Sequence, residues 1–206
     1  MVCDDSQVAN GNDAARLGLV RRGLHLEYAT LAWNVIGVPV LFASAAVAGS
    51  AALVAFALDS TIEIFASTVV IWELNGDPHP SRTRKATRMI GVAFLALAAY
   101  LVLQAVVTVA VGHRPDQSPV GIAWLAVTAA VMFSLAAGKH RTGTSLGNPV
   151  LVAEAKVTVI DGVLAVSVLV GLVLSATAGW WWADTAASLV VVAYGIREGV
   201  HALRHP

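Results

Sequence analysis

The sequence predicts an all-α membrane protein, built as a bundle of six transmembrane helices with both termini in the cytoplasm. Of its 206 residues, 57% are hydrophobic and 13% are charged, whereas soluble domains carry roughly 25% charged residues. Long runs without charge recur along the chain, and each reaches the length of about 20 residues that a helix needs to cross a bilayer. Lys and Arg gather between alternate runs, as they do in multi-pass proteins.

The chain divides into an N-terminal tail at 1–24 and a transmembrane domain at 25–206. The first residues are polar and acidic, unlike the basic start and apolar stretch of a signal peptide. Between the first two uncharged runs, only Ala48-Gly49-Ser50 favours a turn, so these two spans should form a tight hairpin. The expected spans lie at 27–47, 51–74, 89–112, 119–138, 150–176 and 179–203.

The positions of Lys and Arg predict the orientation of the bundle. On the other side of the expected spans only Arg114 appears, so the more basic side should face the cytoplasm of a protein that crosses the inner (cell) membrane several times. Trp180, Trp181 and Trp182 then fall at the outer end of the last span, where aromatic residues anchor helices in the interface. The residues on the basic side are Arg16, Arg21, Arg22, Arg82, Arg84, Lys85, Arg88, Lys139, Arg141 and Arg204.

Three acidic residues are expected near the middle of the bilayer. Asp59 and Glu63 are four residues apart and therefore share one face of the second span. Asp161 lies eleven residues into the fifth span, which runs in the opposite direction and brings it to a similar depth. A charge at the bilayer centre costs about 2.5 to 3.5 kcal/mol on insertion scales, so these acids need a partner, a proton or a cation. Two close carboxylates cannot both ionise cheaply, so a cation and a proton should compete for them.

Other polar residues surround this expected site. Asn34 should lie about one turn to the cytoplasmic side of Glu63, where its amide oxygen could be a neutral ligand or a hydrogen-bonding group in the core. The alternative for the three central acids is that they are protonated and only hydrogen-bond to neighbouring helices. Near the cytoplasmic helix ends, further acids should form solvated ion pairs with Arg22 and Lys156, or else a mouth that gathers cations. These acids are Glu27, Glu73 and Glu154.

Three segments carry a further pattern. They are GSAALVAFALDS at 49–60 followed by Glu63, LVAEA at 151–155 continuing to Asp161, and WAD at 182–184 with Ala187, Gly195 and Gly199. These segments resemble the second, fifth and sixth helices of the cation diffusion facilitator (cation efflux) family. The chain is similar to a short, divergent member of this family that has no C-terminal cytoplasmic domain.

The resemblance implies a metal site on the second and fifth spans. The family's fourth ligand, one turn before the last aspartate, corresponds to Val157, which has no ligand atom. Oxygen ligands alone, with Asn34 or Thr158 completing the set, suit hard cations such as Mn²⁺ or Mg²⁺, although Asp and Glu also bind Zn²⁺. The expected metal ligands are Asp59, Glu63, Asp161 and Asn34.

The resemblance also implies a function, namely a transporter that exports a divalent metal cation, zinc or manganese, from the cytoplasm in exchange for protons. The alternative is a membrane scaffold or regulatory protein that keeps the fold with a degenerate metal site and transports nothing. An enzyme is not expected, because the sequence has no nucleophile and base pair, no metalloprotease spacing and no phosphate-binding glycine loop. The expected partners are the transported cation, protons, the lipid bilayer and a second copy in a homodimer; neither a bound cofactor nor nucleic acid is expected.

Overall fold

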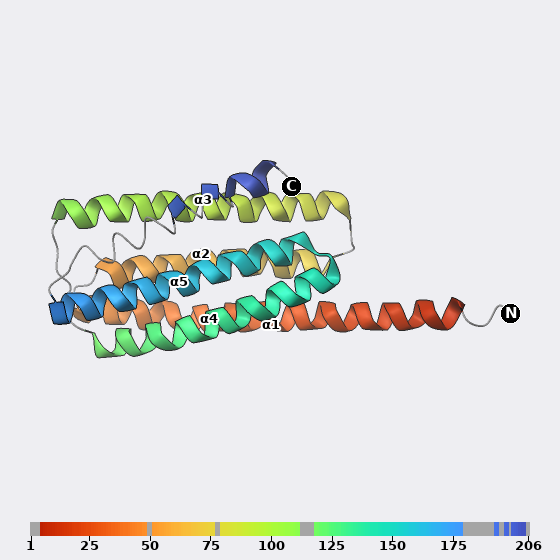
Figure 1. Cartoon of the computed structure of the whole chain (residues 1–206), viewed down its shortest axis with the longest axis horizontal. Helices are drawn as coiled ribbons and strands as arrows, with labels where there is room; N and C mark the ends of the chain where they lie inside the picture. The colour runs from red at the N-terminus through yellow and green to blue at the C-terminus, as the bar shows by residue number, and fades with distance from the viewer. Residues whose placement is uncertain are drawn as a thin grey trace.

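The computed structural model is a bundle of long helices joined by short connections (Figure 1). It describes residues 5–48, 51–76, 79–111, 118–178, 192–193, 196–197 and 199–204. Within these ranges every regular element is helical, as predicted. The long helices are α1 (Asp5–Ala48), α2 (Ala51–Leu74), α3 (Pro80–Val111), α4 (Pro119–Leu146) and α5 (Pro149–Ala178).

Long apolar helices identify the chain as a membrane protein. In the described part of the chain, four helical segments are long and apolar enough to cross a bilayer. Side chains such as Leu103 and Val120 are more than 60% exposed on their surfaces, as expected of helices that contact lipid. The predicted span at 51–74 coincides with α2. The four segments are Ala14–Ala48, Pro80–Val107, Pro119–Leu146 and Pro149–Leu174.

Two helices continue beyond the ends that the uncharged runs predict. α1 begins at Asp5, so most of the predicted tail at 1–24 is helix. α4 continues past 138 to Leu146 and therefore carries Lys139 inside the helix, rather than in the predicted loop. An uncharged run marks only the apolar part of a helix. Extending an existing helix by one residue costs little free energy and needs no apolar side chain, so a helix can continue beyond that run.

Several predictions fall on residues outside the described part of the chain. They are the predictions for the Gly49-Ser50 turn, for Arg114 and for the tryptophans at 180–182. Most of the predicted span at 179–203 is also outside the described residues, although helical residues at 199–204 pack against α3. A Cβ atom added to Gly91 would lie 3.2 Å from the Gly199 carbonyl oxygen, so these two glycines allow a close approach of the two backbones.

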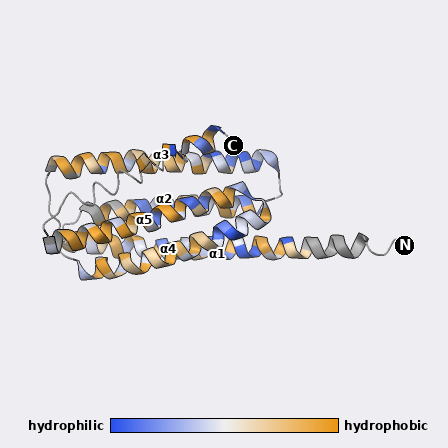
Figure 2. Ribbon diagram, in the orientation of Figure 1, coloured by the Kyte–Doolittle hydropathy of each residue, from blue (hydrophilic) through white to orange (hydrophobic). Residues whose placement is uncertain are grey.

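The helices around the predicted acids form a ring in which α1 packs on α2, α2 on α5, α5 on α4 and α4 on α1. α3 packs against the outside of α2 and α5 (Figure 1). Hydrophilic residues gather at the end of the bundle where α3 begins and α4 leads into α5 (Figure 2). This is the end that the basic residues predict to be cytoplasmic.

A compact cap connects α4 to α5 at this end. Gly147 has a φ of 64°, a left-handed conformation that glycine adopts without strain and that ends α4. The side-chain oxygen of the next residue, Asn148, accepts hydrogen bonds from the backbone N–H groups of Val150 (2.9 Å) and Leu151 (3.0 Å) and so caps α5. The two helices are thereby held as an antiparallel pair.

Candidate functional site

The three predicted acids lie together between α2 and α5. Asp59, Glu63 and Asp161 are 3%, 1% and 2% exposed, respectively. Their carboxyl groups are close enough for the charges of each pair to interact. They come together because α2 and α5 pack side by side and run in opposite directions (Figure 1), which was the basis for expecting Asp161 at a depth similar to that of Asp59 and Glu63.

Several oxygens of these acids are available to a ligand. Apart from the acids themselves, no hydrogen-bond partner among the described residues reaches Asp59 Oδ2, Glu63 Oε2 or either carboxylate oxygen of Asp161. In the same part of the structure, no three acidic, histidine or cysteine side chains converge closely enough to form a complete metal site. The arrangement is therefore an open set of buried acceptors, in which a cation or a proton can lower the cost of burial.

Asn34 and Val157 are also buried, at 1% and 3% exposed. The Asn34 amide nitrogen donates to the backbone oxygen of Thr30, one turn earlier in α1, at 3.1 Å. Its described hydrogen bond thus lies within α1 rather than with the three acids. Val157 belongs to the apolar core, so the position of the family's fourth ligand is filled by a hydrocarbon side chain.

A buried lysine lies on the predicted cytoplasmic side of the three acids. Lys139 in α4 is fully buried, and its Nζ lies 3.1 Å from Glu27 Oε2 in α1. The same ammonium contacts Glu154 Oε1 in α5 and donates to Thr158 Oγ1 at 3.1 Å. We call these four residues, Glu27, Lys139, Glu154 and Thr158, the Lys139 layer.

Thr158 connects the Lys139 layer to the three acids. Its hydroxyl donates to Glu63 Oε1 at 2.6 Å, while Lys139 donates to the same hydroxyl oxygen. Ser67 in α2 adds a second link, because its hydroxyl donates to Glu154 Oε1 at 3.3 Å. One polar network therefore joins all four helices of the ring.

The structure corrects two predictions about these residues. Glu27 and Glu154 were expected near the cytoplasmic helix ends, in solvated ion pairs with Arg22 and Lys156 or in a mouth that gathers cations. Instead, both are fully buried and pair with Lys139. Lys139 itself was expected in the connection between the spans at 119–138 and 150–176. Both errors have the same cause, since the continuation of α4 past 138 brings a cation into the bundle.

A signal for this network is present in the sequence as polar stripes at helical spacing. Thr158 and Asp161 follow Glu154 by four and seven residues, and so lie on one face of α5. α1 has a matching stripe of Glu27, Thr30 and Asn34. Stripes of this kind indicate a polar interior. A solvated helix end needs polar side chains only near its terminus and does not require a polar face that continues into an apolar span.

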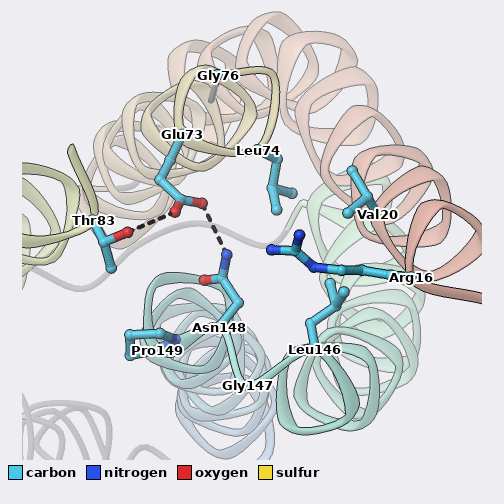
Figure 3. Close-up of a pocket in the computed structure, with 10 residues that line it drawn as sticks. All are labelled: Arg16, Val20, Glu73, Leu74, Gly76, Thr83, Leu146, Gly147, Asn148 and Pro149. Carbon is cyan, nitrogen blue, oxygen red and sulfur yellow. Dashed lines mark hydrogen bonds between the residues drawn. The ribbon is translucent and has the colours of Figure 1, made fainter. Parts of the chain in front are cut away.

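A cavity of about 210 Å³ opens at the predicted cytoplasmic end of the ring (Figure 3). Glu73 accepts hydrogen bonds there from the Thr83 hydroxyl at 3.2 Å and from the Asn148 amide at 3.0 Å. The Arg16 side chain extends into the cavity from α1 (Figure 3). Charged groups of both signs therefore line this opening, which we call the vestibule.

Two leucines lie next to Gly23 in α1, and one of them, Leu74, lines the vestibule. A Cβ atom added to Gly23 in α1 would lie 3.2 Å from Leu151 Cδ2 and 3.3 Å from Leu74 Cδ1. The absence of a side chain at Gly23 lets α1 approach these leucines closely. Along the axis of the ring, the order is therefore vestibule, leucines, Lys139 layer and three acids, spread over about 20 Å of helix from Asn148 to Asp161.

Comparison with known proteins connects this arrangement to a family. The cation efflux transmembrane domain matches residues 86–205, more than half of the chain, and includes Asp161 and the Lys139–Glu154 pair. A protein of Synechocystis sp., named an uncharacterized transporter, is 29% identical over 169 residues, which are 77% of this chain and 54% of that protein. The chain thus spans about half the length of this curated relative. We conclude that the chain belongs to the cation efflux family and carries its transmembrane domain.

Proposed function

We propose that the protein transports a divalent metal cation, exporting it from the cytoplasm in exchange for protons. The observation that carries the proposal is the group of three buried acids on α2 and α5. Apart from the acids themselves, four of their carboxylate oxygens lack hydrogen-bond partners among the described residues. Family membership supports cation transport in general. The basic residues at one end of the bundle support a cell-membrane location with that end in the cytoplasm.

The chemistry follows from the burial of these acids. A divalent cation bound by Asp59, Asp161 and Glu63 offsets charges that the apolar surroundings disfavour. When the cation leaves, protons can replace it on the same oxygens, so the two ligands compete and their movements are coupled. Because the donors are all oxygens, manganese fits the site well, and zinc is the second candidate.

Flux measurements in proteoliposomes with an imposed pH gradient test the proposal. We expect the gradient to drive Mn²⁺ or Zn²⁺ movement by the wild-type protein. Asp59→Asn and Asp161→Asn, which keep side-chain shape but remove charge, should abolish this flux. Thr61→Val, at an exposed position of α2, is the matched control and should transport normally. Undiminished flux in both Asn variants would overturn the site assignment.

The alternative function is a membrane scaffold that transports nothing, and the burial of Val157 at the fourth ligand position favours it. This function predicts that the wild-type protein shows neither pH-driven flux nor saturable binding of Mn²⁺ and Zn²⁺. Val157→His would then create metal binding where the parent has none. Saturable binding by the wild-type protein, lost in Asp161→Asn, would exclude the scaffold.

A further inference from the structure

The Lys139 layer has the composition of a cation site. Around one buried ammonium lie oxygens of two carboxylates and one hydroxyl, contributed by Glu27, Glu154 and Thr158. Carboxylate and hydroxyl oxygens are also ligands of hard divalent cations. The lysine ammonium is a compact point charge that only donates hydrogen bonds, so it can fill such a site as a cation would.

This layer contains more carboxyl groups than ammonium groups. Two carboxylates face one ammonium, and all three groups are fully buried. Apart from each other's carboxyl groups, Glu27 Oε1 and Glu154 Oε2 have no hydrogen-bond partner among the described residues, and both are buried. A divalent cation would neutralise both carboxylates, whereas the ammonium neutralises one.

The layer also lies where a cation would have to pass. Along α5, Glu154 and Thr158 of this layer lie between Asn148 and Leu151 on the vestibule side and Asp161 on the other side. The Thr158 hydroxyl contacts both Lys139 Nζ and Glu63 Oε1. A cation bound in the layer would therefore be connected to the acids of α2 and α5 through this single hydroxyl group.

We propose that Glu27, Glu154 and Thr158 form a second divalent-cation site, which the Lys139 ammonium fills in this structure and leaves when a cation arrives from the vestibule. In this arrangement Lys139 is a tethered cation that closes the path between the vestibule and the three acids. Its role as a closure rests on the proposed transport function. The existence of the second site does not, because it follows from the ligands around Lys139.

Counting bound Mn²⁺ on the full chain in detergent tests the second site. At a low Mn²⁺ concentration, at which Lys139 still holds these ligands in the wild-type protein, we expect Lys139→Gln to bind one more Mn²⁺ per chain than the wild type, because its ligands are already free. The extra site should vanish when Glu154→Gln is added. Arg141→Gln removes an exposed charge two residues away on α4 and should bind as the wild type does. A folded Lys139→Gln protein with no additional Mn²⁺ would overturn the proposal.

A second measurement uses the wild-type protein and does not depend on the folding of any variant. Lys139 is fully buried, so a water-soluble amine-reactive ester should label it slowly. If Mn²⁺ displaces the ammonium, labelling of Lys139, followed by peptide mass spectrometry, should rise several-fold. Labelling of exposed Lys85 should stay constant. Unchanged Lys139 labelling at saturating Mn²⁺ would contradict displacement.

Asp161→Asn separates this proposal from the proposed function. If the three acids are not the transport site, this substitution leaves flux intact, but the extra Mn²⁺ site of Lys139→Gln should still appear. If the second site is wrong, Asp161→Asn abolishes flux while Lys139→Gln gains no Mn²⁺. The two hypotheses therefore fail in different experiments.

Discussion

The ammonium of Lys139 in α4 lies 3.1 Å from the Glu27 carboxylate in α1, and neither side chain is exposed to solvent. This pair ties the first helix of the chain to the helix pair formed by α4 and α5. A buried charge that loses its partner is costly, because the remaining charge stays in a low dielectric without compensation. The stability of the ring should therefore depend on Lys139 far more than on other basic residues.

Lys139→Ala tests this dependence. We expect a loss of about 3–5 kcal/mol in the free energy of unfolding, since Glu27 and Glu154 lose their common partner. Arg141→Ala, on the exposed side of the same helix turn, should change stability by less than about 0.5 kcal/mol. Denaturant unfolding in detergent measures both. Equal stability of the two variants would mean that the buried pair contributes little.

Thr158→Val tests the link between the Lys139 layer and the three acids. Valine keeps the shape of threonine but removes the hydroxyl that donates to Glu63 at 2.6 Å and accepts from Lys139. We expect a loss of about 1–3 kcal/mol, because a buried acceptor and a buried donor each lose a partner. Thr158→Ser restores the hydroxyl and should recover most of the stability. A Val variant as stable as the Ser variant would argue against the link.

Asn148 has two roles that different substitutions separate. Asn148→Ala removes both the cap of α5 and the hydrogen bond to Glu73, and should cost about 1–2 kcal/mol. Asn148→Asp keeps a capping oxygen but places a negative charge beside Glu73. The unfolding temperature of Asn148→Asp should therefore rise when Glu73→Gln is added. No improvement in the double variant would show that the two side chains do not interact.

Two glycine to alanine substitutions should act in opposite directions. An added Cβ at Gly18 in α1 meets no atom within 4 Å, so Gly18→Ala should stabilise the helix by about 0.5–1 kcal/mol. At Gly143 in α4 the same atom would lie 3.0 Å from the backbone nitrogen of Val152, which cannot turn aside. Gly143→Ala should therefore lower the unfolding temperature. The same sign of effect at both positions would contradict the α4–α5 packing described here.

The sequence predicts the helical fold well because membrane spans depend on local composition. The long uncharged runs, the four-residue spacing of Asp59 and Glu63 and the depth of Asp161 are all local properties, and all three acids are buried together. The predicted span at 179–203 lies mostly outside the described residues and stays a prediction. Local composition is thus sufficient to find the helices and the acids of the candidate site.

The Lys139 layer was missed because it depends on which helix faces meet. Glu27 and Glu154 are separated by 127 positions of chain, and their common partner lies just past the apolar part of α4. A count of charges along the chain places each of these residues at a helix end, where water is the obvious partner. Only the closure of α1, α4 and α5 into one ring shows that their charges compensate one another inside the bundle.

The shared lysine also has a consequence for how the protein enters the membrane. Each helix that carries a buried charge pays about 2.5–3.5 kcal/mol if that charge enters the middle of the bilayer alone. Lys139 and Glu154 are fifteen residues apart on adjoining helices, so α4 and α5 can insert as a hairpin whose charges are already matched. Glu27 is made first but meets its lysine only after α4 has been synthesised. We therefore expect α1 to settle at its final depth late in biosynthesis, once the rest of the ring is available to receive it.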